Sequence, residues 1–96
     1  MFATFFEWRI RDGAEEQFEQ AWAEATAILK SHGSMGSALF RNDGGHFCAI
    51  ARWPDRATRD AAFAAADLAA SGAAMRGAVA DTVHCIDLEE VRNLWT

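Results

Sequence analysis

The pattern of apolar and polar positions changes from strand-like to helical within the first third of the chain. Residues 2–10, FATFFEWRI, are rich in aromatic side chains and predict a strand. Asp12-Gly13 ends this strand, and an acidic segment at 14–16 favours the start of a helix. From there apolar side chains recur at helical spacing, which predicts a helix that continues to about Ser31 and stops at Gly33.

Two short apolar runs follow, at residues 37–41 and 46–53, on either side of the turn-forming segment Asn42-Asp43-Gly44-Gly45. Apolar runs around Asn, Asp and Gly are typical of a β-hairpin. Pro54 ends the second run, and Asp55 is a suitable N-cap for a helix that starts near Arg56.

The rest of the chain is rich in alanine and then returns to strand-forming residues. We expect the helix from Arg56 to break around Ser71-Gly72, with a shorter helical piece at 73–80. Residues 82–91 then predict the last strand. The order strand, helix, strand, strand, helix, strand predicts one α+β domain over residues 1–96. Its arrangement is the ferredoxin-like split βαβ, with helices on one face of a four-stranded antiparallel sheet.

The helices can cover only one face of such a sheet, and side chains alternate between the two faces. The rows expected to face the helices are Phe2, Phe6, Trp8 and Ile10, with Phe47, Ala49, Ala51 and Trp53. The opposite rows mix apolar and polar residues: Ala3, Phe5, Glu7 and Arg9, with His46, Cys48, Ile50 and Arg52. A solvated face would be more uniformly polar. We therefore expect a second copy of the chain to cover it, forming a dimeric α+β barrel, although a partly solvated face is the alternative.

Composition and charge narrow the possible functions. The aromatic content of 11% argues against a disordered chain, and no run of 18 residues is apolar and uncharged as a membrane span requires. The net charge is −5, so no basic face for nucleic acid is expected. Cys48 and Cys85 have neither disulfide-framework nor zinc-ligand spacing. We interpret them as small buried hydrophobic residues with reduced thiols, in a cytoplasmic protein.

Four segments together resemble the antibiotic biosynthesis monooxygenase family. They are FEWRIRDG at 6–13, AEEQFEQAW at 14–22, HGSMGSALFR at 32–41 and ARWPDRATRDAAF at 51–63. The resemblance extends from Phe2 to about Val91. It implies the dimeric α+β barrel fold and a small-molecule pocket, either between helices and sheet or within the barrel. Members of this family include cofactor-independent oxygenases of quinols and polycyclic phenols, and haem-degrading oxygenases.

The sequence departs from the haem-degrading branch of the family. As the resemblance implies, members of that branch carry an Asn on the first strand, a Trp in the second helical region and a His after it. The nearest positions here are Phe6, Phe63 and the region of Met75, and no His lies between Asp55 and Asp81. The chain also contains no Tyr, so a tyrosine-assisted mechanism does not transfer. The resemblance therefore implies chemistry without haem, flavin or metal.

Oxygenation without a cofactor needs a general base, an apolar cavity and donors that hold a phenolate or enolate. His84 is the candidate base, because an imidazole titrates near neutral pH. A hydrogen-bonded structural His in the sheet or the dimer contact is the alternative. Glu7, Arg9 and Arg52 are candidates for holding the substrate, and an ion-pair cluster that sets the dimer register explains them equally well.

Aromatic and apolar residues could form the walls of a pocket for an aromatic ring. The candidates are Phe5, Trp53, Phe63 and Met75. Plain core packing is the alternative for each of them. Trp22 is expected to be core, and His32 and His46 are expected at the surface.

The sequence thus predicts a monooxygenase of the antibiotic biosynthesis type, which uses no cofactor and no metal and acts on a small aromatic or polyketide-like compound. The expected partners are a second copy of the chain and a small hydrophobic or aromatic ligand, with no nucleic acid and no membrane. Two alternatives remain. One is a non-catalytic dimeric module that binds a hydrophobic ligand, and the other is a cofactor-free isomerase or lyase that uses the same pocket.

Overall fold

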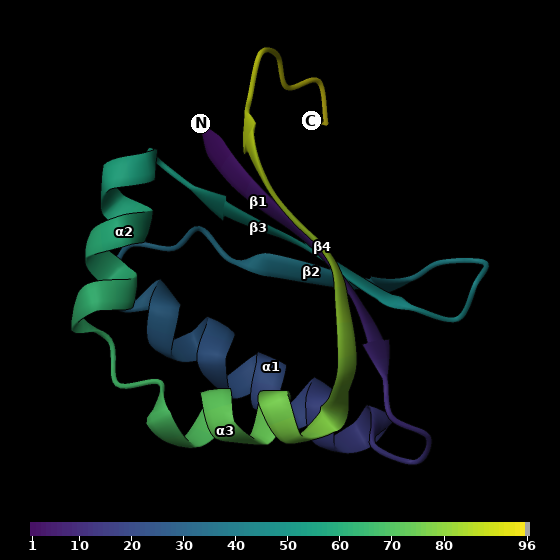
Figure 1. Ribbon diagram of the computed structural model, residues 1–96. Helices are drawn as coiled ribbons and strands as arrows, with labels where there is room; N and C mark the ends of the chain where they lie inside the picture. Colours follow the sequence, from purple (N-terminus) through teal and green to yellow (C-terminus); the bar gives the residue numbers. More distant parts are fainter. Residues whose placement is uncertain (96) are drawn as a thin grey trace.

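The computed structural model describes residues 1–95 and contains four strands and three helices. The strands are β1 (Phe2–Ile10), β2 (Ser37–Arg41), β3 (Phe47–Trp53) and β4 (Val79–Glu89). The helices are α1 (Glu15–Lys30), α2 (Arg56–Ala65) and α3 (Ala69–Ala78). The strands form one antiparallel sheet in the order β2-β3-β1-β4, and the three helices lie on the same side of it (Figure 1). This is the predicted ferredoxin-like α+β fold.

Residues that pair across the sheet share a face, and the pairing confirms the two predicted sets of side chains. Phe6 pairs with Ala49 and Cys85, and these three face the helices. Glu7 pairs with Cys48 and His84, and these three lie on the face without helices, which we call the open face. A β-bulge between Glu7 and Trp8 shifts the register with β4, so that Trp8 pairs with Thr82.

The hydrophobic core consists of two separate groups of buried residues. The larger is built around Phe18 of α1, which packs between Trp8 and Phe47 with ring centroids 4.8 and 5.6 Å away. The smaller lies at the other end of the sheet and comprises Phe2, Trp53 and Ala62. Phe18 and Trp53 are the largest side chains that are fully buried.

The predicted N-cap of α2 is confirmed, because the Asp55 carboxylate accepts a hydrogen bond of 2.7 Å from the Thr58 amide. The predicted helix break at Ser71-Gly72 is wrong. The break lies at 66–68, where Ala66 is extended and the Asp67 carboxylate accepts a hydrogen bond from the Ala69 amide. The short side chain of Asp competes for backbone donors and so begins a new helix there.

The start of the last strand also differs from the prediction, since β4 begins at Val79 rather than at residue 82. Cys85 is exposed, contrary to the prediction that both cysteines are buried, because β4 is an edge strand and most of its residues are exposed. Within residues 1–95, no helix has the length and apolar character needed to cross a membrane.

Candidate functional site

A cavity of about 800 Å³ lies between the sheet and the three helices. Its floor is a row of small side chains that pair across three strands: Thr4 of β1, Ala51 of β3 and Ser37 of β2. Members of both core groups, Trp8 and Trp53, also line it. The two groups stay apart because the small side chains between them are too short to fill the space between the sheet and the helices.

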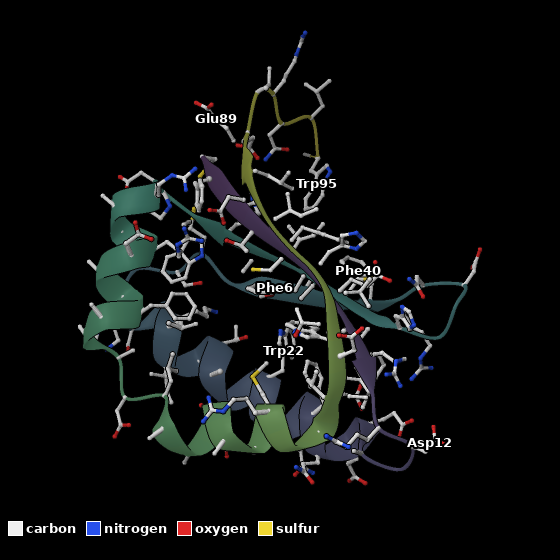
Figure 2. The ribbon with its side chains drawn as sticks, in the orientation of Figure 1. Phe6, Asp12, Trp22, Phe40, Glu89 and Trp95 are labelled. Atoms are coloured by element: carbon white, nitrogen blue, oxygen red, sulfur yellow. The ribbon has the colours of Figure 1, made fainter. Side chains whose placement is uncertain are left out.

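The walls of the cavity are mainly aromatic and aliphatic. Figure 2 shows Phe6 of β1 and Trp22 of α1 in the space between the sheet and the helices, and both line the cavity. Phe63 of α2 and Met75 of α3 also belong to this apolar lining, and the centroid of the Phe63 ring lies 6.0 Å from that of Trp53. Such walls, with a few polar groups among them, are typical of small-molecule sites.

Several of the polar groups at the cavity lie around Arg59 of α2. Its guanidinium donates to Asp87 Oδ1 at 2.9 Å, to Thr4 Oγ1 at 2.9 Å and to Asp60 Oδ1 at 2.7 Å. Hydrogen bonding to Asp87 raises the pKa of Arg59 above its usual range, and the same bond lowers the pKa of the Asp87 carboxyl. Arg59 therefore fixes α2 to β1 and β4, and two carboxylates neutralise its charge.

Two serines of the cavity lining have hydroxyl groups without a hydrogen-bond partner among the described residues. They are Ser37 of β2 and Ser71 of α3. Ser71 is only 3% exposed. A buried polar group without a partner is costly, so such a group in a cavity wall is available to a bound molecule.

The open face carries a second polar cluster, which is centred on Glu7. Its carboxylate lies 2.7 Å from His46 Nδ1 and 3.1 Å from His84 Nδ1. It also accepts a hydrogen bond of 3.2 Å from the side-chain amide of Asn42. These contacts, that of His46 foremost, lower the pKa of Glu7. The cluster therefore ties the hairpin to β1 and β4 on the face away from the cavity.

The structure divides the predicted site residues between the two faces of the sheet. Trp53, Phe63 and Met75 line the cavity. Phe5, Glu7, Arg52 and His84 occupy positions on the open face, as the strand pairing shows. The structure therefore does not bring the eight predicted residues together into one site.

The two predicted arginines also have separate surroundings. Arg52 pairs with Glu90 at 2.9 Å, and its guanidinium lies 5.7 Å from the ring of Trp95. Arg9 is exposed and lines a smaller polar hollow beside the hairpin, together with Arg41 and His46. Glu7 therefore pairs with histidines rather than with the arginines that share its face. His46 is half-buried against Glu7 rather than free at the surface.

Sequence reasoning missed the polar lining of the cavity. Arg59, Asp60 and Ser71 lie in alanine-rich helices and have no motif spacing. Trp22, which was expected to be plain core, is partly buried and lines the cavity. The position of Arg59 could have indicated this polar lining. Arg59 lies one helical turn before Phe63, a predicted pocket residue, and therefore shares its helix face. Within residues 1–95, no three His, Cys, Asp or Glu side chains cluster as metal ligands would.

Comparison with known proteins identifies the family. The sequence profile of the antibiotic biosynthesis monooxygenases matches residues 1–71. The chain belongs to this family. No curated protein matches the chain.

Several solved structures share the fold of this chain. SnoaB, a cofactor-independent oxygenase from Streptomyces nogalater, superposes with a TM-score of 0.83. It is 18% identical, and the match covers 99% of this chain and 97% of SnoaB. Rv0793 from Mycobacterium tuberculosis superposes with a TM-score of 0.79 at 15% identity, and the match covers 96% of both chains. At these identities the likeness establishes the fold.

Proposed function

We propose that this chain is a cofactor-independent monooxygenase that acts on a small aromatic or polyketide-like compound bound in the cavity between sheet and helices. The observation that carries the proposal is the cavity itself, of about 800 Å³, in a chain of the antibiotic biosynthesis monooxygenase family. Its volume lies in the range of small-molecule pockets, and the walls formed by Phe6, Trp22, Trp53 and Phe63 suit the faces of fused aromatic rings.

The reaction that fits such a cavity takes its electrons from the substrate. An activated CH₂ group beside a phenol ring loses a proton, and the resulting electron-rich anion transfers electrons to O₂. One oxygen atom becomes the new carbonyl and the other leaves as water, so CH₂ and O₂ give C=O and H₂O. The substrate supplies all four electrons. The protein then has to remove a proton, exclude bulk water and hold the anion.

Two side chains are candidates for the general base, one on each face of the sheet. His84 lies on the open face, where its Nδ1 contacts Glu7. Asp60 lies at the cavity, where its carboxylate accepts a hydrogen bond from Arg59. A base must come within roughly 2.6–3.2 Å of the proton that it removes. Because His84 lies across the sheet from the cavity, Asp60 is the base that this placement of the substrate favours. Turnover of Asp60→Asn and His84→Ala tests the assignment, because loss of a general base costs roughly 10²–10⁴-fold.

The proposal is tested by following O₂ uptake with dihydroxynaphthalene-type quinols, whose keto tautomers carry the CH₂ group that the reaction requires. Ala51→Leu adds bulk to the cavity floor, and we expect it to abolish uptake that the unmodified chain shows. Ala27→Leu is the matched control, because Ala27 is exposed on α1 and lies outside the cavity. Uptake that survives in Ala51→Leu contradicts the placement of the substrate.

The same assay separates the two alternative functions. Tight binding of aromatic ligands with no O₂ uptake across a broad phenol panel would indicate a binding module. Product formation under anaerobic conditions would indicate an isomerase or lyase. Either result contradicts the monooxygenase.

We further propose that a second copy of the chain covers the open face. Phe40, Ile86 and Leu88 lie on that face and are 51%, 43% and 43% exposed. Proteins of this family are commonly dimeric. The two free thiols, Cys48 and Cys85, are consistent with a reducing compartment, and we propose the cytoplasm.

A further inference from the structure

One arginine of the cavity lining has no carboxylate partner among the described residues. Arg59 and Arg76 both line the cavity, but only Arg59 takes part in the ion pairs found within residues 1–95. Asp60 is the one acidic lining residue there, and Arg59 already holds it at 2.7 Å. Arg76 therefore carries a positive charge that is not paired with any carboxylate of the described residues, although the whole chain has a net charge of −5.

The conformation of α3 positions this charge. Ser71, Gly72, Met75 and Arg76 line the cavity together, because residues three or four apart are neighbours on one face of a helix. A Cβ atom on Gly72 would lie only 3.2 Å from Arg76 Nη1. The guanidinium thus folds back over Gly72, where the absence of a side chain leaves room for it. An added Cβ atom at position 72 would require the guanidinium to move by a few tenths of an ångström.

We propose that Arg76 binds an oxygen anion of the substrate, so that the cavity selects anionic aromatic compounds over neutral ones. This inference rests on the proposed function and adds the charge of the substrate to it. The guanidinium has a fixed charge and several donors, which suits a phenolate, an enolate or a carboxylate. Met75 is then available to contact the ring of the substrate, and the Ser71 hydroxyl, which has no partner among the described residues, is available to a second oxygen.

The test is direct binding rather than turnover, so that it is independent of oxygen chemistry. Quenching of tryptophan fluorescence by 1-naphthoate and by 1-naphthamide compares an anion with a neutral molecule of nearly the same shape. We expect 1-naphthoate to bind about tenfold more tightly, which corresponds to ~1.4 kcal/mol. We expect Arg76→Ala to remove this preference and leave the affinity for 1-naphthamide nearly unchanged.

Two further variants serve as controls. Arg11→Ala removes the same charge from an exposed residue outside the cavity and should keep the full preference. Gly72→Ala should shift the guanidinium by only a few tenths of an ångström and should keep most of the preference, while its Tm stays at or above that of the unmodified chain, because Ala favours a helix interior over Gly. A fall in binding without a fall in Tm excludes misfolding as its cause.

The outcomes separate this inference from the proposed function. Equal binding of the two probes overturns the inference and leaves the monooxygenase proposal intact. A preference for 1-naphthoate that survives in Arg76→Ala overturns the assignment to Arg76. Binding of neither probe overturns the inference even if O₂ uptake is observed with quinols.

Discussion

At the scale of single residues, the molecule depends on charged groups that hold elements together from opposite sides of the sheet. Arg59 connects α2 to β1 and β4 on the cavity side, and Glu7 connects the hairpin to β4 on the open side. Arg59 and Glu7 each lie at the centre of a polar cluster, and each contacts residues that are far away in the sequence. Their roles could not be predicted from the sequence, because contacts over such separations depend on how the strands and helices pack.

The ion pair between Arg59 and Asp87 predicts how stability depends on pH. Because the pKa of Asp87 is lowered in the folded chain, the pair contributes stability above the unfolded pKa of about 3.9. This contribution is lost as the pH falls through the lowered folded value. We expect Asp87→Asn to lower the free energy of unfolding at neutral pH, with the deficit shrinking in acid.

Urea unfolding at a series of pH values measures this effect. Asp43→Asn is the control, because Asp43 lies in the exposed hairpin turn and takes part in none of the ion pairs found within residues 1–95. A deficit in Asp87→Asn that is the same at every pH would contradict the ion-pair account.

At the scale of elements, local sequence signals predicted most of the boundaries. The aromatic run gave the bounds of β1, and the turn-forming residues gave the hairpin between β2 and β3. The predicted helix break at Ser71-Gly72 is wrong, because that prediction depended only on the low intrinsic helix propensity of these two residues. Ser71 is buried in the structure, and Gly72 accommodates the Arg76 guanidinium within an unbroken α3. The presence of a Ser and a Gly at these positions is thus explained by the cavity rather than by a turn.

The cap of α2 gives a prediction at this scale. The Thr58 amide donates to the Asp55 carboxylate and lowers its pKa, so Asp55→Ala should cost about 1 kcal/mol of unfolding free energy. Asp55→Asn keeps an oxygen acceptor and should cost much less. Chemical denaturation of both variants measures the difference. Equal losses would show that the hydrogen bond to Thr58 contributes nothing.

At the scale of the whole molecule, the sequence predicted the sheet and its two faces, and the family resemblance implied a pocket between helices and sheet or within the barrel. The polar lining and the size of the cavity were not predicted. The alternation of side chains was enough to separate the apolar row of Phe6 and Trp8 from the mixed row of Phe5 and Glu7. The cavity depends on the distance between the helices and the floor at Ala51, and alanines give no indication of whether a neighbouring helix closes that space. Sequence reasoning therefore located the open face better than the cavity.

The proposed dimer belongs to this scale as well. Sedimentation at micromolar concentration should give about twice the chain mass of 10.5 kDa. Ile86→Asp places a charge in the exposed apolar part of the open face and should yield single chains. Ala57→Asp adds the same charge on the exposed surface of α2 and should leave the dimer intact. A mass near 10.5 kDa for the unmodified chain would contradict the dimer.

The two cysteines lie on opposite faces of the sheet, and this arrangement provides built-in reporters for both proposals. Cys85 lines the cavity, whereas Cys48 lies on the open face, where burial and the nearby Glu7 charge raise its pKa. A thiol-labelling reagent should therefore modify Cys85 faster, since the thiolate is the reactive form. A compound bound in the cavity would shield Cys85 alone, and association of two chains would shield Cys48 alone. Mass spectrometry of the labelled peptides would thus record occupancy of each face in a single unmodified protein.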